Sequence, residues 1–194
     1  VQSLLARGKG TIYVLVRPKS LGKLDELREF WGKDSVKRVV AIKGDLAQPK
    51  LGVSKGDLTK LKGKVKHLFH LGAVYDLEAS AEEMHKANIV GTESALAFAN
   101  AVNAGCFHLV SSIAAAGLYR GTFTEDMFEE AEDLDHPYYR TKHDSEGLVR
   151  ANGRIPFRIY RPGVVVGHSQ TGFIDKIDGP YYFFKALQRL RESW

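Results

Sequence analysis

Short apolar runs rich in β-branched residues alternate with segments of helical periodicity along almost the whole chain. Residues 11–16 form one such run between Gly10 and Pro18, and residues 21–31 follow with apolar side chains at helical spacing. Strands that alternate with helices run parallel, and the connecting helices cover both faces of their sheet. The pattern predicts an α/β fold, with further strands at 36–42, 65–71, 106–110, 157–160 and 164–166, a helical turn at 58–61 and helices at 81–103, 137–152 and 180–192.

The composition is that of a folded protein with a sizeable core, because 44% of the 194 residues are hydrophobic and 26% are charged. No apolar run approaches the roughly 20 residues that a membrane-spanning helix needs. The single cysteine, Cys106, excludes an internal disulfide framework and fits a reducing compartment. We therefore expect a cytoplasmic protein without a transmembrane segment.

The net charge is +5, with basic residues concentrated in the first third of the chain and acidic residues in the middle. The basic third is either a solvated surface or a region that attracts a polyanion or a phosphorylated cofactor. Nucleic acid is not expected as a partner, because no zinc-finger, helix-turn-helix or RNA-binding signature accompanies the lysines. The seven histidines lack the His-x-x-x-His spacing, so no metal site is predicted, and His67 and His70 are expected to be structural.

Residues able to carry chemistry follow the predicted strands, at the carboxyl ends where parallel sheets bind their ligands. Tyr138 and Lys142 are four residues apart on the helix predicted at 137–152, so their side chains share a face. A nearby ammonium lowers the pKa of a tyrosine from about 10 and makes it a usable general acid or base. Ser111 and Ser112 follow the strand at 106–110, where a serine can also serve as a turn or cap residue.

The order of these motifs resembles the extended short-chain dehydrogenase/reductase family over essentially the whole chain. The resemblance implies a Rossmann-like, doubly wound parallel sheet. More narrowly, the chain looks like the male-sterility-like NAD(P)-binding branch, which contains fatty acyl-CoA reductases and the thioester-reductase domains of carboxylic acid reductases and peptide synthetases. The segments that carry the likeness are Gly44-Asp45-Leu46, His70-Leu71-Gly72-Ala73, 87–92, Ser111-Ser112, 119–122, Tyr138-x-x-x-Lys142 and 161–172, and residues 175–182 are similar to bacterial members.

The resemblance implies a catalytic set around Tyr138, which would give a proton to the carbonyl oxygen of the substrate. Ser112, or less favoured Ser111, would donate a hydrogen bond to that oxygen, where negative charge develops. Lys142 would hold the tyrosine at a useful pKa and bind the nicotinamide ribose. Asn88 either shapes a water-linked proton path or is a buried asparagine that the backbone satisfies.

The resemblance also implies a cofactor site. Arg17 follows the strand at 11–16, at the position where an arginine accommodates the 2′-phosphate of NADP and an acidic residue binds the ribose of NAD. We therefore predict NADP(H), with a solvated surface arginine as the alternative for this residue. The other expected cofactor-binding residues are Asp45 at the adenine amino group, Leu46 on its ring, Leu71, Gly72 and Ala73 beside the cofactor, Tyr138 and Lys142 near the nicotinamide ribose, and Pro162, Gly163 and Val164 near the nicotinamide.

Residues 1–194 are predicted to form a single NAD(P)-binding domain, incomplete at both ends, in which the substrate-binding part begins near residue 165. Residues 1–8 are typical of the end of a helix, and no glycine-rich pyrophosphate loop or preceding strand occurs among the 194 residues. Since that strand lies in the middle of the sheet between its neighbours, we expect the flanking strands to be unpaired on their inner edges.

The predicted function is an NADPH-dependent reductase that transfers hydride to the carbonyl of a fatty acyl thioester or aldehyde, either carrier-bound or a small molecule. A dehydrogenase or epimerase of an alcohol, sterol or sugar nucleotide is the alternative enzyme on the same fold. A regulatory protein that senses NADP is the non-enzymatic alternative. A homodimer is also expected.

Overall fold

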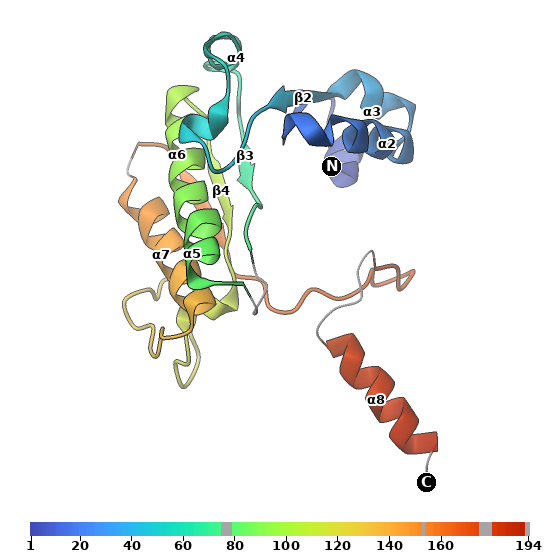
Figure 1. Cartoon of the computed structure of the whole chain (residues 1–194), viewed down its shortest axis with the longest axis vertical. Coiled ribbons are helices and arrows are strands. Elements are labelled where there is room, and N and C mark those ends of the chain that lie inside the picture. Colours follow the sequence, from blue (N-terminus) through green and yellow to red (C-terminus); the bar gives the residue numbers. More distant parts are fainter. Residues whose placement is uncertain (75–78, 153, 175–179, 193–194) are drawn as a thin grey trace. The chain divides into compact units, whose positions relative to one another are not determined.

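Every strand pairing in the computed structural model is parallel, as the alternation of strands and helices predicts (Figure 1). Strand β1 (Ile12–Val16) pairs with β2 (Val39–Lys43), and β4 (Phe107–Val110) lies between β3 (Leu68–His70) and β5 (Phe157–Tyr160). Within the described part of the chain, β1 pairs with β2 alone and β3 pairs with β4 alone. The described strands thus form two separate sheets, one of β1 and β2 and one of β3, β4 and β5.

The structure describes residues 1–74, 79–152, 154–174 and 180–192, so most of the segment 175–182 lies outside it. The chain divides into two compact units, Val1–Arg161 and Pro162–Trp194, each of which is considered by itself. The assignment of 1–194 to one domain stays a prediction.

The helices are α1 (Gln2–Arg7), α2 (Leu21–Trp31), α3 (Lys33–Arg38), α4 (Lys55–Leu61), α5 (Ala81–Met84), α6 (Gly91–Ala101), α7 (Pro137–Ala151) and α8 (Pro180–Glu192), with 3-10 helices η1 (Pro18–Ser20), η2 (Pro49–Gly52) and η4 (Ile113–Ala116) and the π-helix η3 (His85–Val90).

Two of the predicted strands differ from the structure, because the strand predicted at 36–42 begins only at Val39 and the one predicted at 164–166 is not formed. The residues before β2 form α3, which begins after Gly32 at φ 90° and holds the buried Ser35 hydroxyl within hydrogen-bond distance of two carbonyl oxygens. Val36 therefore points to solvent, although its type favours a strand. Residues 164–166 form no strand, and their three valine side chains are exposed.

The main core lies between the three-stranded sheet and the helices α6 and α7, which run along one of its faces (Figure 1). Alternate strand residues such as Phe107 and Leu109 point into this core, while His108 and Tyr160 point to the opposite face. The predicted helix at 81–103 is one helical run that contains the π-helix η3. None of the described helices is long and apolar enough to cross a membrane.

A buried ion pair joins α7 to the end of β5. The Glu146 carboxylate is completely buried and accepts hydrogen bonds from both Nε and Nη2 of Arg161, at 3.0 and 2.7 Å. The same guanidinium donates to the carbonyl oxygens of Thr124 and Met127, and so it also holds the acidic loop before α7. Arg150 lies farther from the carboxylate, at 3.9 Å.

Replacement of Arg161 by leucine is expected to lower the free energy of unfolding by about 3 kcal/mol, because it leaves a buried carboxylate without its main partner. Urea denaturation followed by circular dichroism measures this difference. The exposed Arg140, changed to leucine, is the matched control and should alter stability by less than about 0.5 kcal/mol. Equal losses in the two variants would show that the pair contributes no stability.

Candidate active site

The carboxyl ends of β3 and β4 border a small cavity that brings together several of the predicted site residues. Gly72 and Ala73 follow β3, Ser111 follows β4, and the side chains of Asn88 and Lys142 reach the same space from η3 and α7. The remaining residues around it are His70, Thr92, Leu109, Val110 and Ser145. This arrangement follows from the parallel sheet, whose strands all end at the same edge.

Lys142 is buried, and its ammonium donates a hydrogen bond of 3.3 Å to the carbonyl oxygen of Val110 at the end of β4. Its Nζ lies 5.9 Å from the centre of the Tyr138 ring, one helical turn earlier on α7. Burial lowers the pKa of Lys142 from its usual range, and the Glu146 carboxylate offsets part of this shift. The ammonium therefore lies within reach of both the half-exposed Tyr138 ring and the carboxyl end of β4.

The two candidate serines occupy different environments. The hydroxyl of Ser111 is buried without a hydrogen-bond partner in the described structure, beside the cavity that Lys142 borders. Ser112 is half-buried and caps η4, because its hydroxyl oxygen accepts a hydrogen bond from the Ala114 N–H. The proton of the Ser112 hydroxyl remains available for donation, so both serines are able to act as hydrogen-bond donors.

The side chain of Asn88 is fully engaged by the protein. Its oxygen accepts from the Val74 N–H at 2.8 Å, and its NH₂ group donates to the Val74 carbonyl and to the Thr141 hydroxyl, both at 3.0 Å. Thr141 in turn lies within hydrogen-bond distance of the Tyr138 carbonyl. These contacts fit the structural alternative for Asn88, and its role in a proton path stays a prediction.

His70 is a buried neighbour of this network. The Thr92 hydroxyl donates to the Asn88 carbonyl at 2.6 Å, so it accepts from Nε2 of His70 at 3.0 Å. Nε2 of the ring therefore carries a proton. Burial, with a smaller contribution from the Lys142 ammonium, lowers the pKa of His70 to about 4.

The residues expected at the adenosine end of a cofactor lie at the carboxyl ends of β1 and β2. Arg17 follows β1 and is exposed, and the Gly44 N–H donates to the carbonyl of Val16 at 3.1 Å. A Cβ at Gly44 would overlap the Leu51 carbonyl oxygen, so only glycine fits there. Gly44 thus has a packing reason within the protein, and the exposed Arg17 guanidinium at the carboxyl end of β1 suits a phosphate group.

Leu46 makes a packing contact that the sequence did not suggest. A Cβ at Gly72 would lie 2.9 Å from its side chain, and one at Gly91 would lie 3.0 Å from it. The absence of a side chain at Gly72 thus has a reason within the protein, besides its predicted approach to a cofactor. The half-buried Asp45 uses its carboxylate to accept from the Ala47 N–H at 2.9 Å.

The other predicted residues are not part of the cavity. Leu71 is 68% exposed, and Pro162, Gly163 and Val164 begin the second unit, so their cofactor contacts stay predictions. A larger hollow of about 490 Å³ lies at the far end of α7, beside Phe128 and Gly147. We do not place the chemistry there, because its lining includes none of the predicted catalytic residues.

Sequence reasoning missed His70, Thr92 and Ser145 as residues of the cavity. A signal was available for two of them, since Thr92 lies four residues after Asn88 and Ser145 three residues after Lys142 on helices. His70 carried no comparable signal, because a histidine within an apolar strand can face either side of the sheet.

Comparison with known proteins gives the same family along nearly the whole chain. The family profile described as male sterility protein, of the NAD-binding type, matches residues 1–193. The chain is 33% identical to a component of the linear gramicidin synthase of Brevibacillus parabrevis over 193 residues, which are 92% of this chain and 4% of that protein. It is 29% identical to an aldehyde reductase of Aspergillus flavus, covering 89% of this chain and 19% of that protein.

Solved structures agree with these relatives. The terminal R domain from the myxalamid PKS-NRPS pathway superimposes with a TM-score of 0.84 at 30% identity, over 97% of this chain and 51% of that one. The UDP-glucuronic acid 4-epimerase of Bacillus cereus, in complex with NAD, shares the fold with a TM-score of 0.63 at 23% identity, over 87% of this chain and 53% of that one. The chain therefore spans about half the length of the solved structures that it matches.

Stability is expected to fall as the pH drops from 6.5 to 4, and His70 should account for about 3 kcal/mol of that loss. In this range the unfolded chain binds a proton at His70 and the folded protein does not, so acid favours unfolding. Replacement by glutamine keeps a donor near the Thr92 hydroxyl but removes the titration.

Urea denaturation at several pH values measures the effect, with the exposed His85 changed to glutamine as the control. The His70→Gln variant should show a flatter pH profile than both the control and the parent protein. A profile with the slope of the parent would contradict a buried, neutral His70.

Proposed function

This chain belongs to the male sterility protein family of extended short-chain dehydrogenases/reductases, and we propose that it carries the catalytic residues of an NADPH-dependent reductase. The observation that carries the proposal is the buried ammonium of Lys142, held between the Tyr138 ring and the carboxyl end of β4. A desolvated cation beside a tyrosine is costly to maintain for packing alone, and it suits proton transfer at neutral pH.

The proposed chemistry is reduction of a carbonyl group. A bound nicotinamide cofactor supplies the hydride. The Tyr138 hydroxyl gives its proton to the substrate oxygen on which negative charge develops, while Lys142 stabilises the phenolate that remains. A serine hydroxyl, from Ser112 or Ser111, donates a hydrogen bond to the same oxygen.

The proposed substrate is an acyl thioester on a carrier. One relative, from Cladobotryum, is named a non-canonical nonribosomal peptide synthetase, and the solved R domain comes from the myxalamid PKS-NRPS pathway. Addition of hydride and a proton to the thioester carbonyl gives a hemithioacetal. This intermediate then breaks its carbon–sulfur bond to release an aldehyde and the carrier thiol. A second addition of hydride and a proton would convert the aldehyde to an alcohol.

NADPH is proposed as the cofactor in preference to NADH, because the first charged residue after β1 is the exposed Arg17. Asp45 and Leu46, which follow β2, would hold the adenine end, and Gly72, which follows β3, would let the backbone approach the cofactor closely. A location in the cytoplasm and a homodimer stay predictions.

Replacement of Tyr138 by phenylalanine is expected to lower kcat by about 10²- to 10⁴-fold, because it removes the proton donor while keeping the ring. Spectrophotometric assays of NADPH oxidation with an acyl thioester measure the rate, and NADPH binding should be nearly unchanged.

The variants Ser112→Ala and Ser111→Ala distinguish the two serines, since loss of the donor to the substrate oxygen lowers kcat by about 10²- to 10³-fold.

The same assay separates the alternative functions by their substrates. A long-chain acyl-CoA, a fatty aldehyde and a UDP-sugar are offered in parallel to the parent enzyme. Turnover of the UDP-sugar alone would replace the proposed reaction by that of an epimerase or dehydrogenase. NADPH binding without turnover of any carbonyl would favour a sensor, and full activity of Tyr138→Phe would exclude this residue as the acid.

Replacement of Arg17 by glutamate is expected to weaken NADPH binding by roughly 10- to 100-fold, because a charge-assisted contact to the 2′-phosphate is lost. NADH binding should change by less than about threefold, which isothermal titration calorimetry can measure for both cofactors. The exposed Arg7 of α1, changed to glutamate, controls for the altered net charge. An equal effect on NADPH and NADH would contradict contact with the 2′-phosphate.

A further inference from the structure

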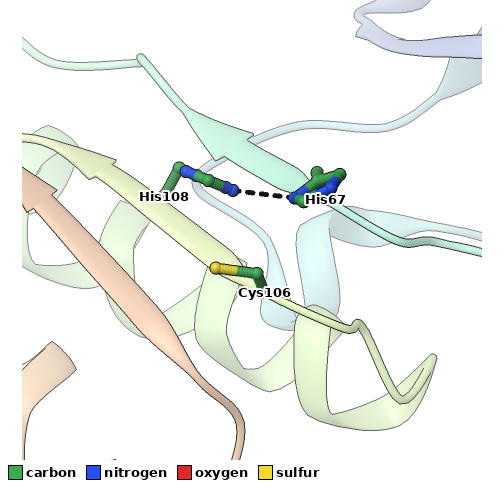
Figure 2. Close-up of side chains that lie close together, drawn as sticks. All are labelled: His67, Cys106 and His108. Atoms are coloured by element: carbon green, nitrogen blue, oxygen red, sulfur yellow. Dashed lines mark hydrogen bonds between the residues drawn. The ribbon is translucent and has the colours of Figure 1, made fainter.

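We propose that His67, Cys106 and His108 form a binding site for one Zn²⁺ ion, at the edge of the sheet opposite the candidate active site. Figure 2 shows their side chains grouped where β3 and β4 begin. One ligand atom from each residue, a ring nitrogen or the thiol sulfur, lies within 4.8 Å of the other two. The sequence predicted no metal site, because its histidines lack the His-x-x-x-His spacing. The two histidines here are 41 residues apart, and only the fold brings them together.

The strand pairing explains why these residues meet. Leu68 of β3 pairs with Phe107 of β4, so His67 and Cys106, the residues just before them, are also neighbours. Gly105 permits the close approach, because a Cβ there would lie 2.8 Å from the Lys66 carbonyl oxygen. Cys106 directly precedes β4 and His108 is the second residue of that strand, so their side chains lie two residues apart along an extended chain.

The distances suit a tetrahedral ion. Nδ1 of His67 lies 3.0 Å from Nε2 of His108, which is close to the separation of two nitrogens that each bind zinc at about 2.0–2.1 Å. In the structure this short distance is a hydrogen bond with one shared proton, which a bound ion would replace. The sulfur needs a modest side-chain rotation to reach about 2.3 Å from the same ion, and water would take the fourth position.

A contact with Tyr160 orients His108 for metal binding. Its Nδ1 lies 2.9 Å from the Tyr160 hydroxyl, which fixes the ring and leaves Nε2 to face His67. Metal-binding histidines commonly use their second nitrogen in this way. The Phe69 and Tyr160 rings stack on the His108 ring, at 4.4 and 5.9 Å between centroids.

Charge and ligand type favour zinc over the hard cations. His108 is buried, and the nearby Arg158 acts on it electrostatically. Arg158 on β5 opposes a bound cation, and the thiolate of Cys106 supplies a compensating negative charge. Two imidazoles and one thiolate form a set that binds Zn²⁺ or Co²⁺ and does not suit Mg²⁺ or Ca²⁺.

The site is separate from the proposed reduction. His108 precedes Ser111 by three residues on β4, which corresponds to roughly 10 Å along an extended strand. An ion at this position would link the starts of β3 and β4 and would stabilise the sheet. Its loss is therefore expected to lower stability and to leave the catalytic residues in place.

Titration of the chelator-treated protein with Co²⁺ tests the site. The expected result is one equivalent bound, with a near-ultraviolet band from thiolate-to-cobalt charge transfer and visible bands of tetrahedral cobalt, all removed by excess Zn²⁺. Cys106→Ser should abolish the charge-transfer band. His67→Ala should weaken Co²⁺ binding by at least about tenfold, since it removes a direct ligand.

His85→Ala, which removes an exposed histidine of η3, is the matched control and should bind Co²⁺ like the parent protein. Zn²⁺ should raise the Tm of the parent and of the control but not that of His67→Ala, whose fold circular dichroism verifies beforehand. Absence of the charge-transfer band in the parent would overturn the proposal. Equal Co²⁺ binding by the His67→Ala and His85→Ala variants would overturn it as well.

Discussion

The buried amide of Asn88 fixes the part of the structure on which the candidate active site depends. It binds both the N–H and the carbonyl of Val74 beyond β3, and it also binds the Thr141 hydroxyl on α7. Loss of any of these bonds would leave a buried polar group unsatisfied, which costs about 1–3 kcal/mol. The loop after β3 and the helix that carries Tyr138 and Lys142 are therefore held at fixed positions relative to each other.

The same helix carries its charges in an order that serves both stability and chemistry. Lys142 faces the small cavity at the sheet edge, and Glu146 one turn later is satisfied by Arg161 from the end of β5. Arg161 thus neutralises most of the charge of the Glu146 carboxylate. The buried Lys142 ammonium is only weakly stabilised by that carboxylate. This separation explains why the Lys142 pKa is lowered although an acidic residue follows on the same helix.

Sequence patterns predicted the features that depend on local spacing. The parallel α/β architecture follows from the alternation of strand and helix segments. The extents of α2 and α7 and the shared face of Tyr138 and Lys142 follow from periodicity within one segment. Val36 was assigned to a strand on its type, whereas the buried Ser35 hydroxyl and the turn at Gly32 stabilise a helix there. Such contacts outweigh the intrinsic strand propensity of valine, because the propensity of one residue amounts to only a few tenths of a kcal/mol.

The sequence by itself determined the order of strands and helices and the residue types that stand at the carboxyl ends of the strands. It also determined the family, because an ordered set of short motifs is far more specific than any one of them. Only the tertiary structure decided which side chains meet: Ser111 and Lys142 beside one cavity, Glu146 with Arg161, and His67 with Cys106 and His108. Such pairings depend on strand register and on close approaches at single glycines, and contacts across many residues leave no periodic trace in a sequence.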